Sequence, residues 1–277
     1  MISGPFPTEM GNLKSLRSFW GYDNAHTGQI PSELGNIPNL EIFNVAINDL
    51  SGSLPPELGS AELLYRLRFF GNPRMTGTIP SEISSLPFLE DIWAGSTGIG
   101  GPFPSTFHVN SSLTAIAVDG NPFTGTVPSS VYSLPNLRNL EIMNTEMTGA
   151  PIPNVLLADF TGTITKLAFN GNAFTGTIPS AIGAFQSLQQ LILNDNDFVG
   201  ALPEEVGTLQ DLTELQIQGN MFTSVPDGIC DLRGEGDEEG EGDEEGEEAL
   251  FLEAYISDCE DVGCTCCTAC GAQTDED

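Results

Sequence analysis

Two arginines, Arg66 and Arg68, are separated by a single leucine and could act together on one ligand group. Residues two apart on a β-strand point to the same face, so their guanidinium groups would lie side by side. Such a pair can hold a carboxylate through parallel hydrogen bonds. The alternative is that both arginines form ion pairs with neighbouring acids such as Asp91, so that no cationic clamp is left free.

Large aromatic residues lie near the same arginines. Trp20 and Trp93 are the only two tryptophans of the chain, and Tyr22 and Phe70 occupy comparable positions in short alternating segments. Exposed aromatics on a rigid sheet are typical binding anchors. We therefore predict a ligand-binding site at Trp20, Tyr22, Arg66, Arg68, Phe70 and Trp93. The alternative is that the aromatics merely cover the sheet.

Catalytic motifs are missing from the sequence. The two histidines, His26 and His108, stand far apart, and we expect both at turns or on the surface. There is no glycine-rich nucleotide loop and no kinase signature, and no pair of acids stands out as a glycosidase pair. The sequence therefore predicts no enzyme and no cofactor.

The elements that must position these side chains are repeats. One proline marks each unit, and the prolines recur every 23–26 residues: Pro7, Pro31, Pro55, Pro80, Pro104, Pro128, Pro153, Pro179, Pro203 and Pro226. Most follow a Gly-x-apolar step, and upstream lies L-x-x-L-x-L-x-x-N, for example Leu64, Leu67, Phe69 and Asn72. The alternating apolar pair predicts a short strand with one buried face, and the asparagine predicts a turn. One such unit cannot bury its own apolar face, but a stack of them can.

This pattern resembles the plant-type leucine-rich repeats of receptor-like kinase ectodomains and polygalacturonase-inhibiting proteins. The resemblance implies an α/β repeat solenoid, a right-handed superhelix with a concave parallel β-sheet and short 3-10 or helical segments on the convex side. Some receptor ectodomains of this type hold the free C-terminus of a peptide with an R-x-R pair in their C-terminal repeats, whereas Arg66 and Arg68 lie in the third repeat. The Thr-Gly-Thr steps, which could form an ice-binding file, are part of the repeat itself.

Two local departures from the repeat have structural consequences. Thr97 and Thr145 replace the turn asparagine, which puts the hydrogen bonds of those turns in doubt. The unit around Pro153 carries extra residues, so we expect the stack to bulge outward at 150–163.

The chain divides by composition into three parts. Residues 1–232 form the repeat domain, 233–248 an acidic low-complexity insert, and 249–277 a cysteine-rich C-terminal cap with an acidic tail. We expect a short helix at 249–256. Disulfides are the preferred interpretation of the clustered cysteines and a metal site is the alternative. Their pairing is left open for Cys230, Cys259, Cys264, Cys266, Cys267 and Cys270.

The formal net charge of −31 disfavours nucleic acids and anionic lipid surfaces as partners. The acidic insert could bind divalent cations weakly, but it lacks the order of a calcium loop. No apolar run is long enough for a membrane span. Disulfides, together with a glycosylation sequon at Asn110, predict an extracellular or cell-surface protein. The sequence contains no signal peptide, and we expect its N-terminus to be incomplete, because the first repeat has no cap to cover its apolar edge.

These features predict a non-catalytic recognition module whose concave face binds a protein, a peptide or a cell-wall polysaccharide. Two alternatives stay open: the ligand-binding part of a receptor-like kinase whose kinase domain lies elsewhere, and a secreted inhibitor of a cell-wall hydrolase.

Overall fold

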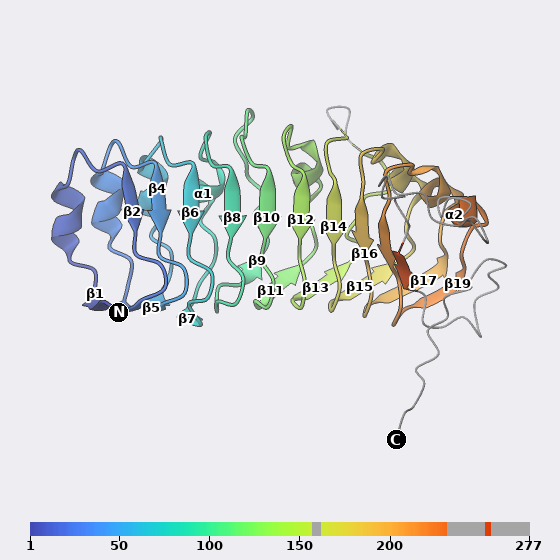
Figure 1. The fold of residues 1–277 in the computed structure, drawn as a ribbon, viewed down its shortest axis with the longest axis horizontal. Coiled ribbons are helices and arrows are strands. Elements are labelled where there is room, and N and C mark those ends of the chain that lie inside the picture. Colours follow the sequence, from blue (N-terminus) through green and yellow to red (C-terminus); the bar gives the residue numbers. More distant parts are fainter. Residues whose placement is uncertain (157–161, 232–252, 256–277) are drawn as a thin grey trace, which may run out of the picture.

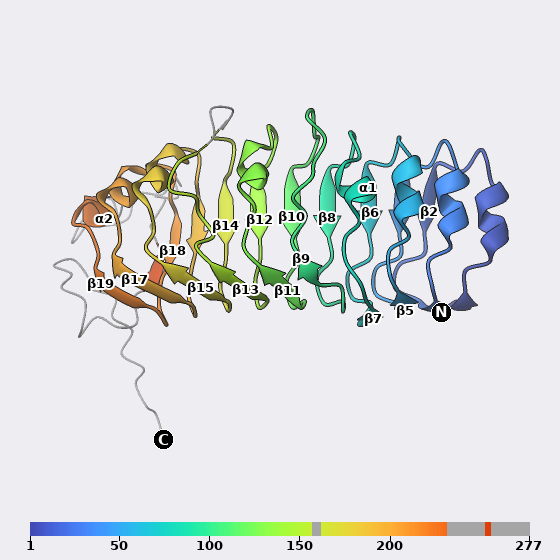
Figure 2. The same ribbon diagram turned by 180° about the vertical axis from the view of Figure 1, so that it is seen from behind.

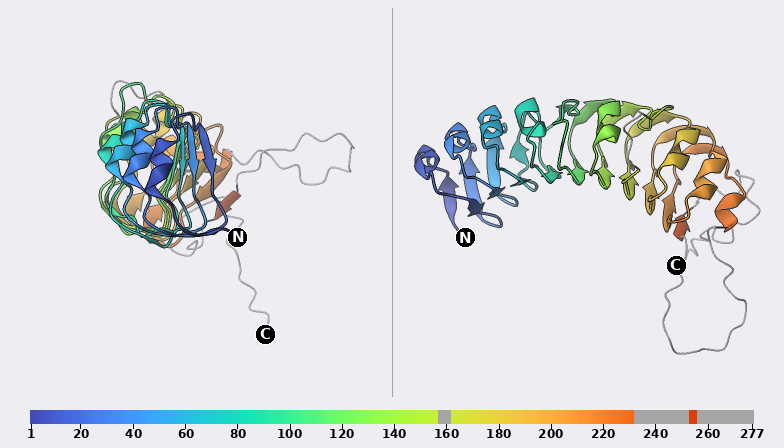
Figure 3. Two further views of the ribbon diagram at one scale, coloured as in Figure 1. Left: turned by 90° about the vertical axis from the view of Figure 1, so that its left-hand side faces the viewer. Right: turned by 90° about the horizontal axis from the view of Figure 1, so that it is seen from above.

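The computed structural model describes residues 1–156, 162–231 and 253–255, and these form an arch of stacked turns (Figure 1). Seen from above, the arch is curved, with strands along its inner side and short helices along its outer side (Figure 3). The same helices line the back of the molecule in Figure 2. The repeat solenoid with a concave parallel sheet, expected from the sequence, is confirmed.

The inner side of the arch is a ten-stranded parallel sheet to which each repeat adds one short strand. Its strands are β2 (Ser18–Trp20), β4 (Ile42–Asn44), β6 (Arg66–Arg68), β8 (Asp91–Trp93), β10 (Ala115–Ala117), β12 (Asn139–Glu141), β14 (Lys166–Ala168), β16 (Gln190–Ile192), β18 (Glu214–Gln216) and β20 (Glu253–Tyr255). Neighbouring strands pair in register, with the middle residue of one opposite the middle residue of the next. A side chain at one strand position therefore lies beside its counterparts in the adjacent repeats.

A second row of parallel strands runs along the lower edge of the arch in Figure 1. It consists of a four-stranded sheet of β1 (Ser3–Pro5), β3 (Ala25–Gly28), β5 (Asp49–Gly52) and β7 (Arg74–Met75). A six-stranded sheet follows, with β9 (Gly101–Pro102), β11 (Phe123–Gly125), β13 (Glu146–Gly149), β15 (Ala173–Gly176), β17 (Asp197–Ala201) and β19 (Met221–Ser224). Five of these strands, β3, β5, β11, β13 and β15, end in a glycine with a positive φ, which no L side chain adopts easily.

Short helices cover the outer side. They are η1 (Thr8–Asn12), η2 (Ser32–Asn36), η3 (Pro56–Ser60), α1 (Ser81–Ser84), η4 (Ser129–Ser133), η5 (Ser180–Ala184), η6 (Glu204–Thr208) and α2 (Gly228–Asp231). A repeat proline in extended conformation directly precedes most of them, as Pro31 does for η2. Proline suits this position because the backbone N–H that it lacks would have no partner inside the helix. Within the described ranges, Pro104 and Pro153 precede no helix.

The core is one continuous column between the two rows of strands. From β4 to β18 the middle strand residue is always buried: Phe43, Leu67, Ile92, Ile116, Leu140, Leu167, Leu191 and Leu215. In the C-terminal repeats a file of phenylalanines joins it. Phe198 stacks between Phe174 and Phe222, with ring centroids 6.5 and 6.1 Å away. The identical period of the repeats brings these rings into register.

Buried asparagines tie successive repeats together. Asn72 donates from Nδ2 to the carbonyls of Val45 and Phe69, and its Oδ1 accepts the backbone N–H of Leu50. One side chain thereby satisfies backbone groups of two repeats, which would otherwise be buried without partners.

The two threonines that replace this asparagine reproduce only part of the network. Thr97 donates to the carbonyl of Ala94 and accepts the N–H of Ile99, and Thr145 accepts the N–H of Met147. The backbone N–H groups of Thr97 and Thr145 donate to Oδ1 of the asparagine in the following repeat, Asn121 and Asn172 respectively. Both hydroxyls also donate to the asparagine of the following repeat, but a threonine is too short to reach the carbonyl of the preceding repeat as Asn72 does.

The segment after Gly149 lies only partly within the described residues, since 157–161 fall outside them. Ile152 is buried, and the Tyr132 hydroxyl donates to the carbonyl of Pro151 over 2.9 Å. Burial raises the pKa of Tyr132 far above its usual range, so this phenol stays a donor. These contacts fasten the start of the segment to η4; the predicted outward bulge at 150–163 stays a prediction.

One expectation for the C-terminus is wrong. The helix predicted at 249–256 is absent from the described part of that segment, where Glu253–Tyr255 form strand β20, paired with β18. Apolar residues at Leu252, Ala254 and Ile256 alternate with period two, as in a strand, and the free edge of β18 offers backbone partners. The acidic insert and Cys259, Cys264, Cys266, Cys267 and Cys270 lie outside the described residues. The backbone of Cys230 belongs to α2, but its side chain also lies outside the description.

Candidate ligand-binding surface

The register of the concave sheet places both tryptophans and one of the two arginines in one row. Trp20, Asn44, Arg68 and Trp93 stand opposite one another on β2, β4, β6 and β8. Each follows a middle residue that points into the core, so its own side chain points to the concave side. At about 4.8 Å per strand, the two tryptophans lie roughly 14 Å apart.

The four aromatic residues of the predicted site form two pairs. Trp20 and Tyr22 are 51% and 53% exposed, and their ring centroids are 6.4 Å apart. Phe70 and Trp93 are half-buried, with centroids 6.1 Å apart. Two aromatic clusters therefore stand at either end of a stretch that spans β2 to β8.

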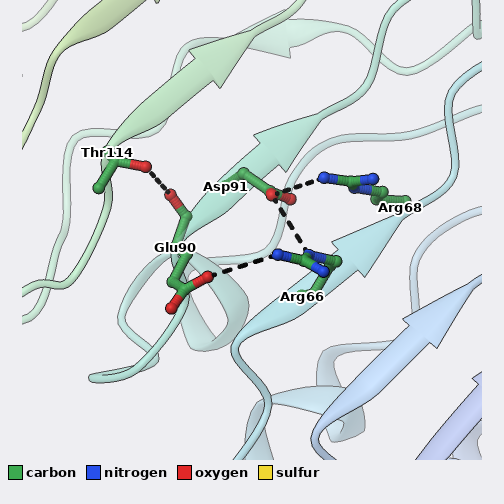
Figure 4. A network of polar contacts seen from close by, with 5 residues as sticks. All are labelled: Arg66, Arg68, Glu90, Asp91 and Thr114. Carbon is green, nitrogen blue, oxygen red and sulfur yellow. Dashed lines mark hydrogen bonds and ion pairs between the residues drawn. The ribbon is translucent and has the colours of Figure 1, made fainter.

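The two arginines lie between these clusters and share one carboxylate (Figure 4). Asp91 Oδ2 is 3.2 Å from Arg68 Nη2 and 3.8 Å from Arg66 Nε, and Glu90 Oε2 is 3.7 Å from Arg66 Nη2. Arg68 also lies over the Trp93 ring, with Cζ 4.3 Å from the centroid, a cation–π contact. The ion pairs with Asp91 that the sequence suggested as an alternative are thus present.

This cluster is short of hydrogen-bond partners. Asp91 Oδ1, Arg66 Nε and Arg68 Nε are buried and without a partner among the described residues. Two arginines and two acids leave the group electrically neutral. Arg66 and Arg68 therefore do not form an unoccupied pair of cations, and a ligand carboxylate would have to compete with Asp91.

The first hollow of the concave face lies between the Trp20–Tyr22 pair and β6. It measures about 710 Å³ and is lined by Trp20, Tyr22, Asn44, Ala46, Ile47, Arg68 and Phe70. Its floor is made of small side chains: Asn44 and Ala46 are buried, as is their neighbour Ile42. Strand alternation alone would expose these three positions on the concave face, whereas the structure buries them.

The second hollow lies on the other side of Phe70, over β8, β10 and β12. It measures about 360 Å³, and Phe70, Trp93, Ala115, Ala117, Asp119 and Glu141 are among the residues that line it. Ala115 and Ala117 form its floor on β10. Phe70 lines both hollows and separates them.

From β14 to β18 the concave face carries amides and paired charges instead of aromatics. Lys166 Nζ is 3.0 Å from Glu141 Oε2. Glu214 accepts hydrogen bonds from Gln190 over 2.7 Å and from Gln216 over 2.6 Å. These polar groups bond to one another across neighbouring strands, whereas the amide oxygens of Asn170, Asn194 and Gln218 are buried without a partner among the described residues.

Neither histidine suggests catalysis, but the expectation for His26 is wrong. It is buried and packs on Phe6, with ring centroids 4.4 Å apart. His26 occupies the strand position that Leu50 occupies in the next repeat, so the repeat alignment could have predicted its burial. His108 lies in a loop, where its Nδ1 accepts the N–H of the exposed sequon residue Asn110.

Among the residues that the structure describes, no three histidine, cysteine, aspartate or glutamate side chains gather as metal ligands. In those same ranges, no helix has the length and apolar character that crossing a bilayer requires.

The structure brings the predicted site residues onto one face. It divides them among two hollows and a cluster of ion pairs around Asp91 whose charges cancel. Asp119 and Glu141, the acids of the second hollow, were not predicted as site residues. Their neighbours Ala115 and Ala117 on the preceding strand are a signal that could have found them, since small residues beside an aromatic leave room.

Comparison with solved structures supports this architecture. A structure described as a TDR receptor is 33% identical, with a TM-score of 0.76, over 83% of this chain and 40% of its own. The Arabidopsis receptor kinase HAESA, solved with the peptide hormone IDA and the co-receptor SERK1, is 28% identical, with a TM-score of 0.75, over 83% and 38%. The chain thus spans about two fifths of the length of these receptor structures.

A plant ice-binding protein matches with a TM-score of 0.68 over 81% of this chain and 71% of its own. At 24% identity it shows the fold alone. No protein-family model and no curated protein sequence matches the chain.

Proposed function

Because this chain is a plant-type leucine-rich-repeat protein, we propose that it is a non-catalytic recognition module that binds a peptide on its concave face. The observation that carries the proposal is the pair of adjacent hollows between Trp20 and Glu141, flanked by half-exposed aromatics. The HAESA structure contains a peptide hormone, which favours a peptide over a polysaccharide. As in a receptor ectodomain, the module would act outside the cell.

The binding surface proposed here comprises Trp20, Tyr22, Arg66, Arg68, Phe70 and Trp93. The aromatics provide contact area at low entropic cost, because their side chains have few rotatable bonds. Arg66 and Arg68 act mainly as supports. Asp91 occupies the place of a ligand carboxylate, and Arg68 holds one face of Trp93.

A peptide-display selection tests the proposal. Random linear peptides are selected on the immobilised protein, and their affinities are measured by calorimetry. Truncation of a central aromatic anchor typically costs more than 1 kcal/mol, so Trp20→Ala and Trp93→Ala should each weaken binding roughly tenfold.

Phe88→Ala is the matched control. Phe88 is 52% exposed, close to the value for Trp20, but it lines neither hollow. Its variant should bind like the unaltered protein. If Trp20→Ala, Trp93→Ala and Phe88→Ala all bind the peptide with the affinity of the unaltered protein, the proposed binding surface is wrong. If the selection enriches no peptide, the proposed function is wrong.

A further inference from the structure

The second hollow has a chemistry that differs from that of the first. Phe70, Trp93, Ala115 and Ala117 give it an apolar lining, whereas Asp119 and Glu141 add two carboxylates. An apolar slot that ends in carboxylates suits a side chain with an aliphatic stem and a cationic head. Lysine and arginine have this form.

Asp119 is the acid available to such a ligand. In the described part of the chain its carboxylate has neither an ion pair nor a hydrogen bond, although the residue is only partly exposed. It lies over Gly95, where any side chain would collide with it. Glu141, in contrast, is already paired with Lys166. The second hollow therefore carries about one uncompensated negative charge.

The surroundings do not offset this charge. Arg68, the nearest cation on the Trp93 side, is bound to Asp91. The chain as a whole has a formal charge of −31, and a field of that sign concentrates cationic partners at the surface.

We propose that the second hollow binds a basic side chain of the peptide, an inference that rests on the proposed function. The charged head lies at Asp119 and the aliphatic stem between Phe70 and Ala117. The first hollow then takes an aromatic or other apolar residue of the same peptide. The centres of the two hollows, at β4 and β10, are three strands apart, or about 14 Å. An extended chain covers that distance in about four residues.

Short glycine peptides, acetylated and amidated at their ends, test this assignment. They carry phenylalanine and arginine about four positions apart, in both chain orders. The matched probes replace arginine with citrulline, which keeps the shape but loses the charge. Loss of a charge-assisted contact to Asp119 should weaken binding roughly tenfold.

The two tryptophans report on the two hollows separately, since Trp20 lines the first and Trp93 the second. In Trp20→Phe the remaining fluorescence comes from Trp93 and should respond to the arginine end of the probe. In Trp93→Phe the remaining fluorescence comes from Trp20 and should respond to the phenylalanine end of the probe.

Asp119→Asn preserves the shape of the hollow and should remove the preference for arginine over citrulline. Asp211→Asn removes the same charge from an exposed site that lines neither hollow, and should keep the preference.

The outcomes separate the two proposals. Peptides that bind but show no difference between arginine and citrulline on the unaltered protein would overturn the basic-side-chain assignment and leave the proposed function intact. An arginine preference that survives in Asp119→Asn would also overturn it. If neither these probes nor any displayed peptide binds, both proposals are wrong.

Discussion

The two halves of the concave sheet share one backbone and differ in their outward side chains. From β2 to β8 the surface carries tryptophans and an arginine pair beside open hollows, whereas from β14 to β18 it carries lysine, glutamate and glutamine. In the second half the polar groups bond to one another, as Glu214 does with Gln190 and Gln216. Both halves have buried polar atoms without a hydrogen-bond partner among the described residues, but in the first half these belong to the charged side chains of Arg66, Arg68 and Asp91, and in the second to the amides of Asn170, Asn194 and Gln218.

The comparison shows that the repeat separates stability from recognition. Core residues come from the same strand positions in both halves, so the fold makes no distinction between them. Only residues that point away from the core differ, and these are free to vary because they contribute little to folding.

The largest effect should appear in the core, in both halves alike. Phe198→Ala removes a fully buried ring that stacks on Phe174 and Phe222, and should lower the free energy of unfolding by about 3–5 kcal/mol. Leu67→Ala, beneath the arginines, should cost about 2–5 kcal/mol. Urea unfolding followed by circular dichroism measures both. A loss well below this range at Leu67 alone would show that the first half does not depend on the same core.

A smaller effect should distinguish the two charged clusters. Asp91→Asn removes the carboxylate that Arg66 and Arg68 share and leaves Glu90 as the remaining acid beside Arg66. Because both arginines are partly exposed, the free energy of unfolding should fall by about 2 kcal/mol. Glu141→Gln breaks a single pair with Lys166 and should cost about 1 kcal/mol or less.

Urea unfolding at low and high salt measures whether Asp91→Asn lowers the free energy of unfolding more than Glu141→Gln does. Asp91→Asn should also increase the affinity for an acidic peptide, because the arginine pair is then free to bind a carboxylate. Equal losses of stability in the two variants would contradict the shared role of Asp91.

The smallest effect should be found at exposed concave positions. Tyr22→Ala and Gln216→Ala should each change the free energy of unfolding by no more than about 0.5 kcal/mol, because neither side chain lies in the core. Thermal unfolding of the two variants against the unaltered protein tests this. A clear loss at Tyr22 would mean that the aromatic row serves the fold as well as a ligand.

The architecture was predictable because its signals are periodic. The spacing of the prolines and the alternation around Leu67 recur in many repeats. A strand that is ambiguous in one repeat can therefore be assigned by alignment with the others. His26 and residues 249–256 were mispredicted where one unit departs from the pattern. In each case the position within the repeat, rather than the residue type, decides the outcome.

The site was predictable only as a row of side chains. That Trp20, Tyr22, Phe70 and Trp93 lie on the concave face follows from strand alternation. That Asp91 holds both Arg66 and Arg68 depends on rotamers and distances between strands, which no local pattern specifies.

The sequence by itself determined the repeat and which strand residues face away from the core, because these depend on chain-local periodicity. The tertiary structure alone decided that the arginine pair is neutralised, that Ile42 and Ala46 are covered, and that Asp119 stands unpaired beside Trp93. These features arise from side chains that are about 24 residues apart in the chain and only about 5 Å apart across the sheet.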